Sequence, residues 1–168
     1  KHSYYKKYSY VYGNTDRKQF LSKNFINIKI NSNILSSNNR KYLAKFIDLN
    51  INNIPDIIEI HNRPSYVETI KKRLNSRIIL YFHNNPLTIS GSKLLSERLN
   101  LLNKCEYIFF NSKWTKRQFF KDIDESIYKN KFEICYQSTK KSKFNINDKK
   151  NIITFVGKLN TAKGYDVF

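Results

Sequence analysis

The sequence contains no methionine, two cysteines, three prolines and four glycines, and its 31 basic residues outnumber 13 acidic ones among 168. Two cysteines are too few for a disulfide framework, so we expect Cys105 and Cys135 to be buried free thiols. No apolar run approaches the ~18 residues that cross a bilayer, which excludes a transmembrane helix. The first twelve residues alternate lysine with tyrosine and lack the apolar stretch of a signal peptide.

The two ends of the sequence predict an internal fragment of a longer protein. It begins at Lys1, contains no methionine, and stops at Phe168 directly after a strand-like segment and a glycine-containing loop. Hydrophobic residues make up 40% of the chain and aromatic residues 15%. These proportions supply a core for one ordinary domain, so disorder is not expected despite the charge.

The formal net charge of +18 favours anionic partners, but it does not name one. Lysine (24), asparagine (22) and isoleucine (21) dominate the composition, whereas alanine occurs twice. These residues have AT-rich codons, so an AT-rich genome explains much of the bias. The basic residues are also spread along the chain, and we therefore expect no specific nucleic-acid partner.

Strand-like and helix-like segments alternate along the chain, which predicts an α/β fold with a mostly parallel sheet and helices on both faces. Strands are expected over 25–30, 56–60, 77–82, 107–110, 132–136 and 152–156. Helices are expected over 40–50, 64–74 and 93–103, and Ser92 is expected to cap the last of these. A further helix is expected after Ser112, in a segment that carries Trp114, Phe119 and Phe120. Trp114 is expected to pack in the protein interior. Residues 137–150 are polar and lysine-rich and break the alternation, which is typical of a linker.

Polar residues follow the predicted strands, at the edge where open parallel sheets bind ligands. His61 and Asn62 follow the strand at 56–60, and His83 and Asn84 follow the strand at 77–82. A single histidine in such a place is most often structural, but two in matching positions leave a functional role equally open.

A second cluster combines Gly157 and Gly164 with Lys158 and Lys163. Glycine lets a backbone approach a ligand closely, and lysines beside a strand end suit phosphate charge. The Gly-x-x-x-x-Gly-Lys-Ser/Thr pattern of a Walker loop is absent. Taken alone, the cluster fits a solvated surface loop as well as a phosphate site.

Four segments resemble motifs of family-four glycosyltransferases of the GT-B fold. Residues 155–164, FVGKLNTAKG, resemble the start of the family's C-terminal domain, where Gly-Arg-Leu is followed by Lys-Gly. Three others resemble the family's PDIIHxHN strand, its histidine-containing strand end and its xDxIxxVSxxT segment: PDIIEIHN (55–62), YFHN (81–84) and CEYIFFNSKWT (105–115). Residues 1–50 match only loosely. The match does not include the family's first strand and glycine-rich loop, nor most of its C-terminal domain with the Glu-x7-Glu motif.

The resemblance implies a Rossmann-like sheet that forms the N-terminal half of a GT-B fold. It places an acceptor-side domain at 1–138, a linker at 139–150 and the first strand and loop of a donor-binding domain at 151–168. His83 matches the histidine near the reacting centre, and His61, Asn62 and Asn84 would line the acceptor side. The donor diphosphate would be bound by Gly157, Lys158, Lys163 and Gly164, with lysine at 158 where the family has arginine.

By the same resemblance, the chain is part of a retaining glycosyltransferase that moves a sugar from a nucleotide-sugar to a glycan or lipid-linked acceptor. Envelope polysaccharide or lipopolysaccharide synthesis in a bacterium is the expected setting, in the cytoplasm with peripheral contact to anionic lipid on the inner face of the plasma membrane. No cofactor or metal is expected, because no His/Asp/Cys cluster has metal-ligand spacing. The 168 residues alone are expected to transfer no sugar. Two alternatives stay open, a basic α/β module that binds nucleic acid and a GT-B sugar-nucleotide epimerase.

Overall fold

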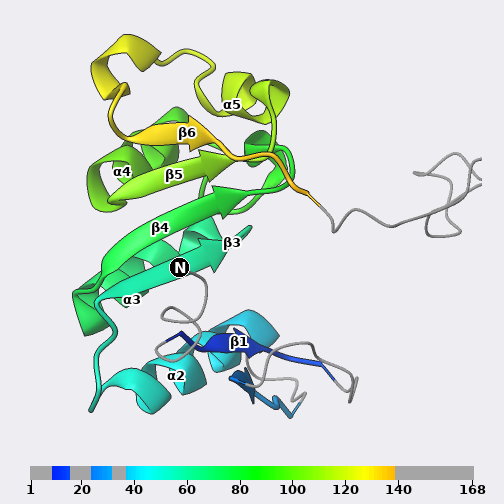
Figure 1. Ribbon diagram of the computed structural model, residues 1–168, viewed down its shortest axis with the longest axis vertical. Helices are drawn as coiled ribbons and strands as arrows, with labels where there is room; N and C mark the ends of the chain where they lie inside the picture. The colour runs from blue at the N-terminus through cyan, green and yellow to red at the C-terminus, as the bar shows by residue number, and fades with distance from the viewer. Residues whose placement is uncertain (1–8, 16–23, 32–36, 139–168) are drawn as a thin grey trace, which may run out of the picture. The chain divides into compact units, whose positions relative to one another are not determined.

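The computed structural model describes residues 9–15, 24–31 and 37–138 (Figure 1). The chain divides into two compact units, Lys1–Gln137 and Ser138–Phe168. The predicted linker at 139–150 and the predicted donor-side segment at 151–168 lie outside the described residues. Their assignment therefore stays a prediction.

Within the described residues, the first unit contains a parallel sheet of four strands in the order β3-β4-β5-β6. These strands are β3 (Ile57–His61), β4 (Arg77–Phe82), β5 (Tyr107–Phe110) and β6 (Phe132–Ile134). Their arrowheads point the same way in Figure 1. The continuous apolar run of β4 lies between two partner strands, as expected for a strand in the interior of a parallel sheet.

A second, two-stranded parallel sheet joins β1 (Val11–Gly13) and β2 (Phe25–Asn27). The sequence predicted β2, over a longer range, but not β1. The three residues of β1 follow a lysine- and tyrosine-rich stretch with no clear period, so neither length nor alternation marked them as a strand.

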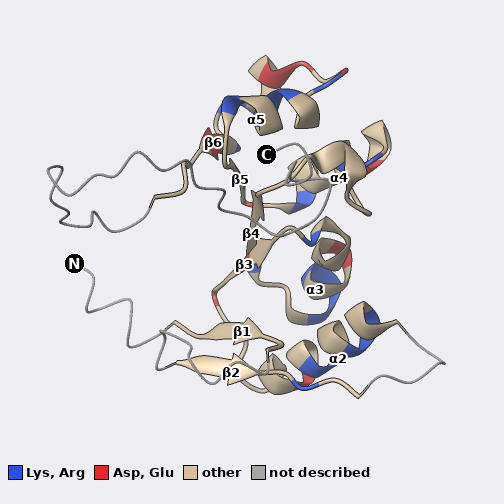
Figure 2. Cartoon of the chain, turned by 90° about the vertical axis from the view of Figure 1, so that its right-hand side faces the viewer, with Lys and Arg blue, Asp and Glu red and all other residues tan. Residues whose placement is uncertain are grey.

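Four α-helices connect or flank these strands in the described part of the chain. They are α2 (Asn38–Asn50), α3 (Val67–Leu74), α4 (Leu95–Lys104) and α5 (Lys113–Phe119). Short 3₁₀ helices cover Pro64–Tyr66 (η1), Pro86–Thr88 (η2) and Glu125–Tyr128 (η3). The first two begin at a proline, whose fixed φ suits the first position of a helix. The predicted fold class, an α/β fold with parallel strands flanked by helices, is confirmed. The expected helices on both faces are not seen among the described residues, where the α-helices lie along one side of the strands (Figure 2).

Among the described helices, α3, α4 and α5 cover one face of the four-stranded sheet, and Figure 2 shows α2 next to α3 on the same side, beside β1 and β2. Ile58 and Ile60 of β3 point toward this covered face and are buried. On α5, Phe119 packs with ring centroids 5.4 Å from Phe82 and 5.3 Å from Phe110. All three phenylalanines are fully buried, and each such side chain contributes about 1.5–3 kcal/mol to folding.

The opposite face of this sheet is less covered in the described residues. Its side chains alternate with the buried ones, because successive residues of a strand point to opposite faces. Ile57 and Glu59 on β3 are exposed, and Tyr107 and Phe109 on β5 are half-buried. His61 and Tyr81 lie on this same, less covered face, and so does the candidate site described below.

Ser92 does not cap α4 as the sequence predicted. Its hydroxyl is buried and donates to the carbonyl of Pro86 at 2.7 Å. The helix begins three residues later at Leu95, and the Glu97 carboxylate accepts from the backbone N–H of Leu94 at 3.0 Å. The serine hydroxyl is satisfied by a buried loop carbonyl instead of by the helix N-terminus.

Two side chains expected to be buried are exposed. Trp114 is 48% exposed, because α5 turns Thr115 and Phe119 toward the core and leaves the tryptophan on its outer side. Cys135 is exposed because it follows the end of β6, whereas Cys105 is buried as predicted. Ser112 caps α5 as predicted, with its hydroxyl accepting from the Thr115 N–H at 3.1 Å.

Candidate active site

The carboxyl ends of the four parallel strands meet at one edge of the sheet, and polar residues gather there. β3 ends at His61, His83 follows β4, and Asn111 follows β5. The Asn62 N–H donates to the carbonyl of Tyr81 at 3.0 Å, which continues the β3–β4 ladder by one residue. This edge is where open parallel sheets bind ligands, so its side chains form the candidate site.

His61 and His83 contact each other directly at this edge. Nδ1 of His61 lies 2.7 Å from Nε2 of His83, and the rings are close to parallel, with 8° between their planes. Oε1 of Glu59 lies 3.2 Å from Nε2 of His61, and Nε2 of Gln137 lies 2.8 Å from Nδ1 of His83. Protein groups therefore occupy all the ring nitrogens of the pair.

Strand register explains why these groups meet. His61 lies beside Tyr81 in the β3–β4 pairing, and His83 is two residues beyond Tyr81 on the same face. Glu59 is two residues before His61 and shares that face as well. Gln137 reaches the site because the chain after β6 passes the end of β5, where the Cys135 N–H donates to a β5 carbonyl at 2.9 Å.

Two asparagines hold the backbone of His83 from either side. Oδ1 of Asn62 accepts from the His83 N–H at 2.8 Å, and Nδ2 of Asn111 donates to the His83 carbonyl at 2.8 Å. Asn111 is fixed in turn, because its Oδ1 accepts from the Thr115 hydroxyl at 2.6 Å. Asn62 adopts a positive φ of 51°, a conformation that asparagine tolerates better than most residues. Together these bonds fix the backbone of His83, from which its ring projects.

The ring of Tyr81 contacts both imidazoles. Its ring centroid lies 4.1 Å from that of His83 and 5.5 Å from that of His61. Its hydroxyl donates to the carbonyl of Cys135 at 2.5 Å. Burial, reinforced by Cys135, raises the pKa of the Tyr81 hydroxyl, so this side chain remains a neutral donor.

The site lowers the pKa of two groups, Glu59 and His83, which favours the charged form of the first and the neutral form of the second. The hydrogen bond from His61 lowers the pKa of the Glu59 carboxyl, which favours its charged form. Burial, followed by repulsion from His61, lowers the pKa of His83 and favours its neutral form. At neutral pH the edge therefore presents the Glu59 carboxylate, which contacts His61, and a neutral His83 imidazole that has a lone pair on one nitrogen.

The structure brings together three of the predicted site residues and does not bring in the others. His61, Asn62 and His83 form the network described above. Asn84 is exposed and lies beside the network without a described bond into it. The predicted diphosphate-binding residues Gly157, Lys158, Lys163 and Gly164 lie outside the described residues, so their role stays a prediction.

Sequence reasoning missed Glu59 and Gln137. Glu59 had a usable signal, because a residue two positions before a strand-end histidine shares its face. Gln137 had none, since it stands where the alternation of helix and strand breaks down. Asn111 directly follows β5, and its bond to the His83 carbonyl depends on strand register that the sequence does not specify.

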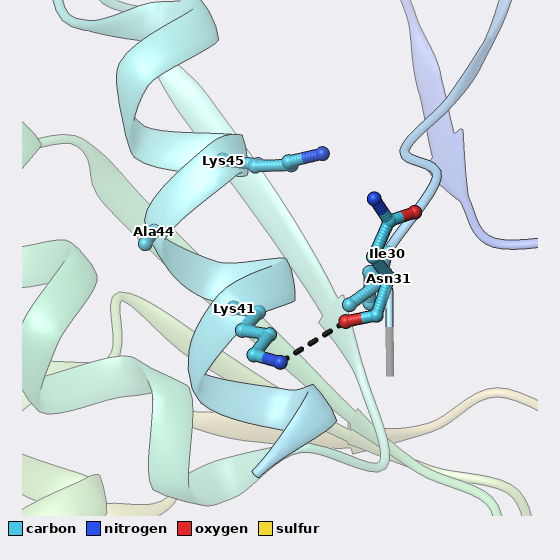
Figure 3. A pocket seen from close by; sticks show the side chains of 5 residues that line it. All are labelled: Ile30, Asn31, Lys41, Ala44 and Lys45. Atoms are coloured by element: carbon cyan, nitrogen blue, oxygen red, sulfur yellow. Dashed lines mark hydrogen bonds between the residues drawn. The ribbon is translucent and has the colours of Figure 1, made fainter. Parts of the chain in front are cut away.

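Two hollows in the described surface lie away from the histidines. One, of about 340 Å³, is lined by Ile30, Asn31, Lys41, Ala44 and Lys45 (Figure 3). Both of its lysines are engaged by carbonyls of the segment after β2, Lys41 with Asn31 at 3.0 Å and Lys45 with Lys29 at 2.7 Å. The other, of about 360 Å³, lies between α2 and α3. Neither combines polar groups with the strand ends.

Among the described residues, no group of three His, Cys, Asp or Glu side chains is placed to hold a metal ion. No helix in that part of the chain is long and apolar enough to cross a membrane. Comparison with known proteins finds no family model, no curated protein and no solved structure that matches the chain.

Proposed function

We propose that the chain forms the acceptor side of a glycosyltransferase that moves a sugar from a nucleotide-sugar to a hydroxyl of a glycan or lipid-linked acceptor. The observation that carries the proposal is the direct contact between His61 and His83 at the carboxyl edge of the sheet. These histidines come from two of the four motifs that resemble family-four glycosyltransferases, and they are 22 residues apart in the sequence.

The chemistry of the edge suits a sugar hydroxyl. A hydroxyl both donates and accepts, and imidazoles supply both functions in neutral form. The aromatic ring of Tyr81 beneath the pair gives an apolar surface beside these polar groups. Lys158 and Lys163 would neutralise the diphosphate that leaves the donor, a role for which fixed positive charge is effective.

Contact with an anionic membrane surface belongs to the same proposal. Lysines and arginines lie on all four α-helices of the described part (Figure 2), and they outnumber acidic residues in the chain. A cytoplasmic enzyme acting on lipid-linked sugars would use this charge to stay near the inner face of the plasma membrane. The charge supports attraction to such a surface without defining a specific lipid.

The test is nucleoside diphosphate release by the complete gene product, assayed over a panel of nucleotide-sugars with and without glycan or lipid-linked acceptors. We expect acceptor-dependent release, a loss of about a hundredfold in kcat for His83→Ala, and weaker donor binding for Lys158→Ala and Lys163→Ala. Asn100→Ala, an exposed position on α4, is the matched control and should behave as wild type.

Two outcomes would replace the proposal. Conversion of a nucleotide-sugar with no acceptor and no transfer product would favour an epimerase. Absence of any nucleotide-sugar chemistry, together with single-stranded DNA binding that weakens steeply with salt, would favour the nucleic-acid module.

A further inference from the structure

We infer that Asn111 and Thr115 are positioning residues for the transfer reaction, because together they hold the backbone of His83 and so set where its imidazole meets the sugar. The inference rests on the proposed function, since it concerns how the site presents His83 to a substrate. It is carried by two hydrogen bonds that connect the start of α5 to the end of β4. Asn111 donates to the His83 carbonyl at 2.8 Å, and Thr115 donates to Asn111 at 2.6 Å.

His83 lies one residue beyond the end of β4, where the regular pairing of the sheet stops. On the β5 side, the backbone N–H of Asn111 donates to the carbonyl of Phe82 at 3.1 Å, and the Asn111 side chain donates to the next carbonyl, that of His83. Asn62 does the same on the β3 side, with its N–H on the Tyr81 carbonyl and its side chain on the His83 N–H. Asparagine side chains therefore continue at His83 what backbone groups do along the strand.

The orientation of the Asn111 amide is determined by its two partners. A carbonyl oxygen only accepts, so the amide nitrogen faces the His83 carbonyl and the amide oxygen faces the Thr115 hydroxyl. The opposite orientation would set two acceptor oxygens against each other. The Thr115 hydroxyl therefore gives its single hydrogen to Asn111, and in its 3.0 Å contact with Ser112 the serine hydroxyl is the donor.

The position of Thr115 is set by its helix and not by Asn111. Thr115 is 2% exposed, and its backbone N–H donates to the Ser112 hydroxyl oxygen that caps α5. One turn later, the fully buried Phe119 packs against Phe82 at the end of β4. Cap and packing thus place α5, and the bond from the Thr115 hydroxyl to Asn111 transmits this placement to His83.

The expected consequence of losing this bond is a slower reaction and not weaker donor binding. Rates depend steeply on the placement of groups around the reacting centre, and a displacement of about 1 Å can cost about a hundredfold. The residues predicted to bind the donor diphosphate, Lys158 and Lys163, are not part of this network. A displaced His83 should therefore lower kcat and leave the KM for the donor in place.

The first experiment uses the 168-residue chain and reads the position of His83 from the proton shifts of its imidazole. The Tyr81 ring, whose centroid is 4.1 Å from that of the imidazole, makes these shifts sensitive to small displacements. Thr115→Val removes the hydroxyl at similar size and should move the His83 shifts. Thr115→Ser keeps the hydroxyl and should leave them near the wild-type values. Thr69→Val, at an exposed position on α3, is the matched control and should change nothing.

Ser112→Ala separates positioning from helix stability in the same spectra. It removes the cap of α5, so it should lower the stability of the chain, but it keeps the bond between Thr115 and Asn111. The His83 shifts should therefore stay in place in Ser112→Ala. Unchanged His83 shifts in Thr115→Val, or shifts of equal size in Ser112→Ala, would overturn the inference.

The second experiment tests the amide orientation with two variants that bring the same charge next to His83. Asn111→Asp sets an acceptor against the His83 carbonyl, whereas Asn62→Asp keeps an acceptor for the His83 N–H. At neutral pH the urea midpoint of Asn111→Asp should be the lower of the two. Equal midpoints, or the reverse order, would overturn the inference.

The third experiment measures sugar transfer by the complete gene product. Thr115→Val should lower kcat about tenfold and change the donor KM by less than about twofold, and Thr115→Ser should recover most of the loss. Thr69→Val should match the wild type. A wild-type kcat in Thr115→Val would refute the inference while the proposed function stands. The expected His83 shifts in a protein that transfers no sugar would refute the proposed function and, with it, the role of Asn111 and Thr115 in transfer.

Discussion

Asn62 offers a stability test of the site that needs no substrate. This residue makes two separable contributions, a hydrogen bond from its Oδ1 to the His83 N–H at 2.8 Å and a backbone conformation with φ of 51°. Asn62→Ala removes both, Asn62→Gly removes the bond and keeps the conformation accessible, and Asn62→Asp keeps an acceptor oxygen. The series therefore separates the bond from the backbone strain.

The expected magnitudes follow from the two terms. A lost hydrogen bond that leaves a half-buried donor without its partner costs about 1 kcal/mol. Alanine held at positive φ costs about 1–2 kcal/mol more. Glycine avoids that strain, but it gives up about 0.4–1 kcal/mol through the greater freedom of its unfolded chain. We therefore expect Asn62→Ala to cost about 2–3 kcal/mol, Asn62→Gly about 1–2 kcal/mol, and Asn62→Asp the least.

The assay is urea unfolding followed by far-ultraviolet circular dichroism, with stability taken from the midpoint and slope. Asn100→Ala on the exposed side of α4 serves as the control and should shift stability by less than about 0.5 kcal/mol. If Asn62→Ala is more stable than Asn62→Gly by about 0.4–1 kcal/mol, the positive φ makes no contribution. If all three variants match the wild type, Asn62 does not hold the His83 backbone in solution.

Three further results are expected from the described residues. Phe119→Ala should lower the free energy of unfolding by about 3–5 kcal/mol, because the ring is fully buried among other phenylalanines. Chemical denaturation checks this value, and a loss below about 1 kcal/mol would contradict the packing. In the native protein a thiol reagent should label Cys135 and spare Cys105, whose pKa burial raises to about 12, and both should react in denaturant. Stability should fall on acidification in two ranges, because the folded pKa values of both His83 and Glu59 are lowered. The first fall begins below about pH 6.5, as His83 is protonated in the unfolded chain, and the second below about pH 4.5, as Glu59 is. Stability measured against pH checks both, and a rise between pH 6.5 and 5 would contradict the His83 shift, as a rise below pH 4.5 would contradict the Glu59 shift.

The elements with the strongest local signals were predicted almost to the residue. The apolar run at 77–82 is β4, the helix at 40–50 is α2 with two further residues at its start, and Ser112 caps α5. Each depends on a pattern that tertiary structure reinforces, such as a buried run or a side-chain cap. Ser92 shows the limit of such patterns, because a buried carbonyl competed with the helix N-terminus for its hydroxyl.

The sequence predicted the position of the candidate site but not the hydrogen-bond partners of its residues. Two histidine-containing strand ends in a parallel sheet placed His61 and His83 at one edge, and strand pairing put them in contact. Which nitrogen faces which partner depends on Glu59 and Gln137, and the glutamine enters only because the chain after β6 turns back across β5. Such long-range contacts are set by the packing of the whole sheet, not by any local pattern.

The most direct test of the account is the structure of the complete gene product with an acceptor saccharide bound. We predict a saccharide hydroxyl within hydrogen-bond distance of the His83 imidazole, at the carboxyl ends of β3 and β4, with the His61–His83 contact retained. A saccharide bound away from the carboxyl ends of β3 and β4, with Gln137 still on His83, would contradict it.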